Sequence, residues 1–73
     1  MYAVIEIQDT KTEVSTLSFG FETEAEANQK FYEILWYASA SNVPIHGAVL
    51  IGDGYLIKSD RIEHPVAEPP IEE

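Results

Sequence analysis

The chain has 73 residues and no cysteine, and its 13 Asp and Glu residues against 4 Lys and Arg residues give a formal net charge of −9. This length allows one small domain, and without cysteine neither a disulfide nor a structural thiolate zinc site can stabilise it. The acidic balance argues against direct nucleic-acid binding, which needs a basic surface, and it permits a basic protein partner.

The sequence carries no signal for a membrane or for export. No apolar run approaches the length of a membrane span, and no basic segment precedes an apolar run at the N-terminus. We therefore expect a cytoplasmic protein that does not enter a membrane.

The first elements are two strands. Residues 2–8 alternate in polarity, and one side of this segment holds Ala3, Ile5 and Ile7. A period of two with β-branched residues predicts a strand. A polar turn follows at residues 9–12, and residues 13–19 predict a second strand that forms a hairpin with the first.

Residues 23–40 predict the one long helix of the chain. Thr23 and Glu26 have the spacing of a capping box, in which the hydroxyl and the carboxylate each satisfy a backbone N–H. At 100° per residue, one stripe of the helix is apolar, and we expect it to face the core. The stripe consists of Ala27, Phe31, Ile34, Leu35 and Ala38.

The helix has a second apolar side. Trp36 lies about 180° from Ala27 on the helical wheel. We call this side the helix strip, and its members are Tyr32, Trp36, Tyr37 and Ala40. One helix has only one sheet to pack against, so the helix strip is expected to face water, a partner or another subunit. The alternative is that Trp36 folds over a sheet edge or lies under the tail.

The C-terminal half predicts two more strands and a tail. Residues 45–51 are the most apolar strand, and Gly52-Asp53-Gly54 predicts a tight hairpin turn. Residues 55–62 carry charges typical of an edge strand. Residues 63–73 hold three prolines and four glutamates and are expected to form a disordered acidic tail, which leaves residues 1–62 as the domain.

The order of elements predicts the fold class. The chain reads ββαββ, an α+β domain with a four-stranded antiparallel sheet, one helix packed on one face, and strand order 2-1-3-4. The other face of such a sheet is left uncovered. This is a second reason, beside the helix strip, to expect a homo-oligomer.

One sequence pattern extends over most of the chain. It includes the N-terminal ten residues, Ile34-Leu35, the strand at residues 45–51, the glycine turn and the lysine after that turn. The positions that carry the pattern are His46, Ala48, Val49, Leu50, Gly54 and Lys58. The pattern resembles a family of short uncharacterised proteins from bacterial, phage and mobile-element genomes. The resemblance implies a mobile-element accessory role such as counter-defence, in the host cytoplasm if the chain is phage-encoded, and it implies no catalytic motif.

The chain departs from this family at two places. Trp36-Tyr37 stands where the family usually has Ala-Ala, and Gly47 stands where it usually has Ser. Small residues let helices approach closely, so the bulky pair is expected to change the partner or the packing.

Few residues suggest chemistry. His46, early in its strand, could meet a ligand or a hydrogen-bond partner. No segment matches a nucleophile elbow or a phosphate-binding loop, and the presence of only two histidines and no cysteine argues against a dedicated metal site. We therefore expect no cofactor, no metal and no enzymatic activity.

Three functions remain open from the sequence. The first is a non-catalytic homo-oligomeric binding protein that acts on a host protein through the helix strip. The second is an oligomeric sponge for a nucleotide signal, with Lys30, Lys58 and Arg61 from several chains binding phosphate and the aromatic residues stacking on the base. The third is a hydrolase or isomerase that uses His46 with a carboxylate. Together the candidate ligand-binding residues are Lys30, His46, Gly47, Lys58 and Arg61.

Overall fold

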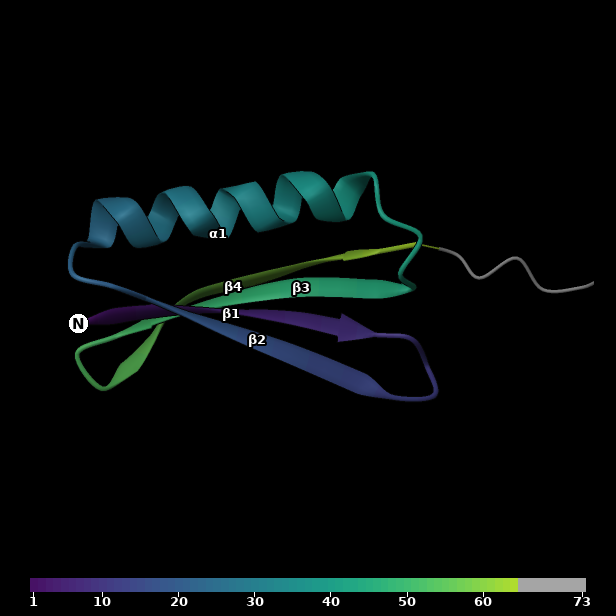
Figure 1. Ribbon diagram of the computed structural model, residues 1–73, viewed down its shortest axis with the longest axis horizontal. Coiled ribbons are helices and arrows are strands. Elements are labelled where there is room, and N and C mark those ends of the chain that lie inside the picture. Colours follow the sequence, from purple (N-terminus) through teal and green to yellow (C-terminus); the bar gives the residue numbers. More distant parts are fainter. Residues whose placement is uncertain (65–73) are drawn as a thin grey trace, which may run out of the picture.

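The computed structural model describes residues 1–64, which form a four-stranded antiparallel sheet covered on one face by one helix (Figure 1). The elements are β1 (Tyr2–Asp9), β2 (Val14–Phe21), α1 (Glu24–Ser39), β3 (Ile45–Gly52) and β4 (Tyr55–Glu63). The strand order is β2-β1-β3-β4. The predicted ββαββ fold and strand order are confirmed.

The pairing of the strands decides which side chains face α1. β1 is central and pairs along its whole length with β2 and β3, from Tyr2 opposite Gly52 to Asp9 opposite Ile45. Because side chains alternate across a strand, the even positions of β1 and β3 point to the helix and the odd positions point away. Val4 and Leu50, which pair with each other, are completely buried beneath α1.

α1 begins at the predicted cap. The Thr23 hydroxyl accepts a hydrogen bond from the Glu26 backbone N–H at 3.2 Å, which confirms half of the capping box. The other half was wrong. The Glu26 carboxylate accepts from the Thr23 hydroxyl at 2.9 Å instead of from a backbone N–H. The hydroxyl can serve both groups because its oxygen accepts while its hydrogen is free to donate.

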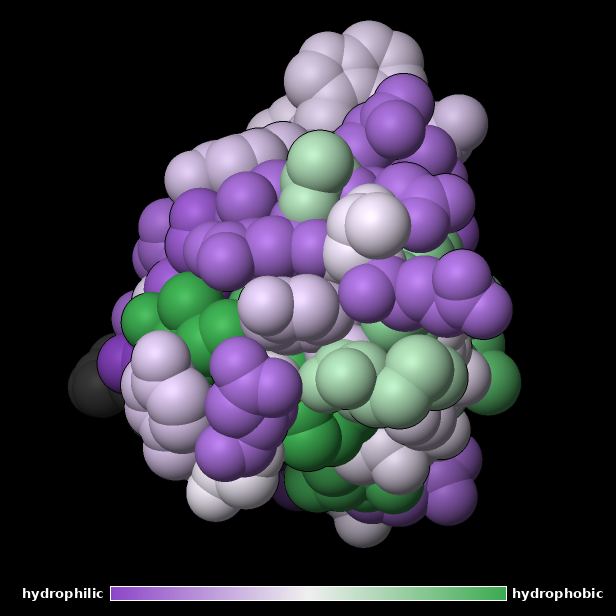
Figure 2. Space-filling view, turned by 90° about the vertical axis from the view of Figure 1, so that its left-hand side faces the viewer, coloured by the Kyte–Doolittle hydropathy of each residue, from purple (hydrophilic) through white to green (hydrophobic). Residues whose placement is uncertain are grey.

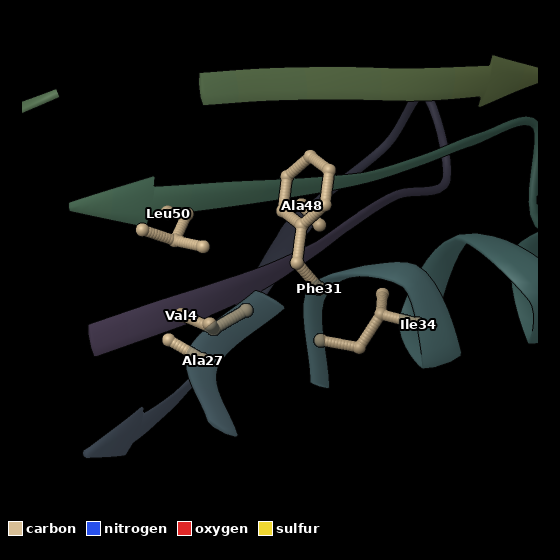
Figure 3. Close-up of a cluster of buried hydrophobic side chains, with 6 residues drawn as sticks. All are labelled: Val4, Ala27, Phe31, Ile34, Ala48 and Leu50. Atoms are coloured by element: carbon tan, nitrogen blue, oxygen red, sulfur yellow. The ribbon is translucent and has the colours of Figure 1, made fainter. Parts of the chain in front are cut away.

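The core is a single small cluster between α1 and the two central strands. Four of the five predicted helix positions are buried, and Leu35 packs against the cluster while partly exposed. Figure 3 shows the buried cluster, which consists of Val4, Ala27, Phe31, Ile34, Ala48 and Leu50. Each larger side chain contributes about 1.5–3 kcal/mol on full burial. Two of the six are alanines, so the helix–sheet core is modest.

The C-terminal end of the described chain is tied to the helix. β4 ends at Glu63, one residue beyond the predicted strand, and the His64 ring Nε2 donates to the Ala38 carbonyl at 2.7 Å. The His64 backbone N–H donates to the Pro44 carbonyl at 2.7 Å. These residues therefore pack with the domain. The rest of the predicted tail, residues 65–73, lies outside the described residues.

The turn between β3 and β4 has the geometry that its sequence favours. Asp53 and Gly54 both have positive φ, at 53° and 84°, as in a two-residue type I′ hairpin. Just before it, Gly52 lies against the ring of Tyr2. A Cβ added at Gly52 would meet two ring atoms at 2.4 and 2.7 Å, and Ile57 at 3.0 Å.

Gly52→Ala should therefore lower the free energy of unfolding by about 1–3 kcal/mol, because the Tyr2 ring must move to admit the methyl group. Gly20→Ala is the matched control. Gly20 lies in edge strand β2 with nothing within 4 Å of an added Cβ, so its effect should stay within about 0.5 kcal/mol. Urea unfolding followed by circular dichroism measures both. Equal losses in the two variants would contradict this account.

Candidate functional site

The helix strip is exposed on the outer side of α1. The exposed fractions are 56% for Tyr32, 70% for Trp36 and 58% for Tyr37, and Ala40, the C-cap of the helix, is also exposed. The alternative in which Trp36 folds over a sheet edge was wrong. The other alternative, in which the tail covers Trp36, involves residues outside the described part of the chain. Three aromatic side chains thus stand at the surface within six positions of one helix.

The aromatic rings of the helix strip are held in pairs. Trp36 and Tyr37 meet edge to face, with ring centroids 5.1 Å apart and planes at 75°. Tyr32 meets the buried Phe31 in the same way, at 5.2 Å and 87°. Such pairs contribute about 0.5–1.5 kcal/mol beyond the area that they bury. The helix strip is therefore an ordered surface that loses little side-chain entropy on binding.

A cation lies on the β4 flank of the helix strip. The Lys58 ammonium donates to the Tyr32 hydroxyl at 3.2 Å and lies 4.9 Å from the centroid of that ring. It is also 5.6 Å from the centroid of Phe31. These cation–π contacts fix the lysine against the helix. The acidic chain thus has one positive group at the edge of its aromatic surface.

The structure does not bring the three predicted phosphate-binding cations together in one chain. Lys30 lies on the β2 flank, 3.1 Å from the Glu33 carboxylate and 4.4 Å from the centroid of the Phe19 ring. The guanidinium of Arg61 is 3.3 Å from the carboxylate of Glu63. By register Arg61 is on the sheet face away from α1, opposite Gly47. A shared pocket would need several chains.

His46 is enclosed beneath α1. Its exposed fraction is 4%, and its Nε2 lies 2.6 Å from the Glu6 carboxylate, which also accepts from the Gln8 amide at 3.4 Å. This buried His–carboxylate pair lies on the helix-facing side of β1 and β3. His46 therefore does not share a surface with the cations proposed beside it in a ligand site.

The space at Gly47 is used by the neighbouring strand. A Cβ added there would meet the Asp60 carbonyl oxygen at 3.1 Å and the Arg61 Cβ at 3.3 Å. β4 therefore occupies the space beside this glycine, and no room for a ligand is left at its Cα.

The face of the sheet away from α1 is a second candidate surface, which we call the open face. Its two central strands present mostly aliphatic side chains there. These outward positions are Ala3, Ile5, Ile7 and Asp9 of β1 and Ile45, Gly47, Val49 and Ile51 of β3. Antiparallel sheets with a solvated face usually place polar residues on it. Figure 2 views the end of the molecule that holds the β3–β4 turn, where hydrophobic residues lie below α1 among hydrophilic ones.

Two shallow hollows mark the ends of the open face. One, of about 540 Å³, is lined by residues near the β3–β4 turn, among them Ala3, Gly20 and Leu56. The other, of about 510 Å³, is lined by residues that include Ile7 and Val49. Both are open depressions over a sheet and neither is an enclosed cavity.

Within residues 1–64, no three His, Asp or Glu side chains gather as metal ligands would. α1 is too short and too polar to cross a membrane.

The exposure of Trp36 predicts its fluorescence. The chain has one tryptophan, so its emission maximum and its quenching by acrylamide should both approach those of free N-acetyltryptophanamide. If copies of the chain associated through the helix strip, the emission would shift to shorter wavelength as the protein concentration rises. A blue-shifted, protected indole in dilute protein would contradict the exposed position.

A titration tests the end of the sheet near the first hollow. The nearby Asp53 carboxylate raises the pKa of Tyr2 above its usual value of 10.0, and desolvation and Glu24 act in the same direction. Well below pH 10, Tyr2 is neutral in both states and adds no pH dependence to the free energy of unfolding. Its contribution to that free energy falls above pH 10, because the phenol ionises first in the unfolded chain.

Asp53→Asn should lower the pKa of Tyr2 toward 10.0. The absorbance titration of the chain minus that of its Tyr2→Phe variant isolates this phenol, with and without the Asp53 change. An unchanged midpoint would mean that Asp53 is not the cause.

Sequence reasoning found the helix strip but did not decide which sheet face α1 covers. The alternation of β1 suggests that the side with Ile5 and Ile7 faces the helix. The structure shows the reverse, with Glu6 and Gln8 on the helix side. No family model matches this chain, and comparison with curated proteins and solved structures also found no match.

Proposed function

We propose that this protein is a small non-catalytic binding protein that works as a homo-oligomer and recognises a protein partner through the helix strip. The observation that carries the proposal is Trp36, which is 70% exposed between two further exposed aromatic residues on a capped helix. An indole in this position has no role in the core of the chain. Tryptophan and tyrosine are the residues that most often dominate the energy of protein interfaces.

The chemistry around the helix strip describes the partner. Glu33 is exposed on the same helix, and Glu24 and Glu26 are exposed in its first turn. An apolar groove with basic residues at its rim would complement this surface, because opposite charges at the rim speed association and select the partner. The acidic balance of the whole chain acts in the same direction.

The resemblance to short proteins of phages and mobile elements supplies the biological setting of the proposal. In that setting the partner is a host protein, and binding blocks or diverts it as a counter-defence. The protein would act in the cytoplasm of the host.

A nucleotide sponge is supported less well. Each of the three cations that would bind phosphate already has a partner within its own chain: Glu33 for Lys30, Tyr32 for Lys58 and Glu63 for Arg61. The buried position of His46 against Glu6 likewise supports a structural role for that residue more than a catalytic one.

Trp36→Ala should remove partner binding without unfolding the chain. We expect the variant to retain its thermal unfolding midpoint within a few degrees, because an exposed side chain contributes little to stability. Its affinity for the partner should fall about 30-fold or more, as for other interface tryptophans. Quantitative affinity capture from host lysate with the wild-type and variant chains identifies the partner, and titration of the purified partner measures the loss.

Tyr55→Ala is the matched control, because Tyr55 is an aromatic residue of similar exposure, 63%, at the β3–β4 turn. It should bind the partner as the wild type does. Equal binding by Trp36→Ala and wild type would remove the helix strip from the proposal. A nucleotide panel that raised the unfolding midpoint of the wild type would favour the sponge instead.

A further inference from the structure

We propose that the open face binds a second copy of this chain, so that two sheets pack face to face in a two-fold dimer with both helices outside. The inference rests on the proposed homo-oligomer and names the surface that forms it. It does not depend on the identity of the protein partner.

The distribution of aliphatic residues across the sheet is the first argument. On the helix-facing side, β1 carries Glu6 and Gln8 in its second half. On the open face, the same half carries Ile7 and ends with Asp9, and Ile5 lies opposite Val49 at the centre of the sheet. A solvated face would show the opposite pattern. The open face therefore has the composition of a face that is covered in the working protein.

The charge of the chain is the second argument, because it selects the occupant. Residues 1–64 contain ten acidic and four basic side chains. The register places three of these fourteen on the open face: Asp9, Arg61 and Glu63, with a net charge of −1. Two acidic copies repel each other through most of their surface. The open face is where they can meet with the least like-charge contact.

The positions of those three charges fit an interface between copies. All three lie at the end of the sheet away from the β3–β4 turn, and two of them are on edge strand β4. The middle of the face, from Ser18 through Ile5 and Val49 to Ser59, is uncharged. An apolar centre with polar residues at its rim is the usual anatomy of a homodimer interface.

The size of the open face is the third argument. With strands about 4.8 Å apart and about 3.3 Å per residue, four eight-residue strands present roughly 500 Å². Two such faces bury roughly 1,000 Å², which reaches the lower bound for a specific interface. Sheets packed in this way lie about 10 Å apart, with strand directions within about 30°.

This dimer has a consequence for binding. α1 lies on the side of the sheet opposite the open face (Figure 1). Face-to-face packing therefore leaves both helix strips uncovered, and they point in opposite directions. One dimer can hold two partner molecules.

Two substitutions on one strand test the proposal. Ser18 and Ser15 are both exposed on β2, but Ser18 pairs with Ile5 on the open face and Ser15 pairs with Gln8 on the helix side. Ser18→Glu should raise the dimer dissociation constant at least about tenfold, because it places like charges in the interface. Ser15→Glu adds the same charge on the other side and should leave dimerisation unchanged. Sedimentation equilibrium across a concentration series measures both, with circular dichroism to establish that the variants fold.

The wild type should be a dimer whose unfolding midpoint rises with protein concentration. A wild type that stays monomeric at several hundred micromolar would overturn the proposal. Equal weakening by Ser18→Glu and Ser15→Glu would overturn it in favour of pairing along the β2 edge. Loss of the dimer in Trp36→Ala would overturn it in favour of the helix strip.

The failure of this inference can be told apart from failure of partner recognition. A Ser18→Glu monomer that still binds one partner molecule supports both assignments of surface. A dimer that survives in Trp36→Ala while partner binding is lost supports them as well. The third outcome is a dimer that forms through the open face while Trp36→Ala leaves partner binding unchanged. This outcome would support the present inference and overturn recognition through the helix strip.

Discussion

The pairing of β1 with β3 is the constraint on which the rest of the molecule depends. It aligns Val4 with Leu50 under the helix and Ile5 with Val49 on the opposite face, so both faces of the central pair are apolar. Phe31 and Ile34 of α1 close the first face and are almost completely buried. One helix cannot close both faces, because a sheet has two sides and the described chain has one covering layer. The excess of apolar surface follows directly from this pairing.

The two exposed surfaces differ in chemistry, and the difference suggests different roles. The helix strip consists of aromatic side chains with polar atoms, flanked by Lys58, and resembles the hot spots of transient interfaces. The open face is flat, aliphatic and nearly free of charge at its centre, as homodimer interfaces tend to be. We therefore propose self-association through the open face and partner recognition through the helix strip, because the chemistry of each surface suits that contact. In the proposed dimer this assignment also leaves the aromatic residues of the helix strip free.

The sequence was sufficient for the elements and their order, because local signals determine them. Thr23 marks the start of the helix, the 3.6-residue period marks its buried side, and Asp53-Gly54 determines the hairpin. The exposure of Trp36 followed from the same wheel. What the sequence could not supply was long-range. The pair between His46 and Glu6 joins residues forty positions apart, and only the register of β1 and β3 brings them together. The sequence also did not determine which face α1 covers, because alternation identifies the two faces of a strand without showing which one lies inside.

The polar pair under the helix also bears on why the open face is aliphatic. At the end of the sheet near the β3–β4 turn, the space beneath α1 holds Val4 and Leu50, while at the other end it holds Glu6 and His46. A hydrogen-bonded polar pair of this kind contributes little net stability compared with apolar residues of similar size. Ile7 of β1, at the same end, instead points to the open face. The chain thus places polar residues under its own helix and an aliphatic residue on a face that no element of residues 1–64 covers. In the proposed dimer this arrangement would make the assembled copies more stable than an isolated copy, because the second copy covers Ile7.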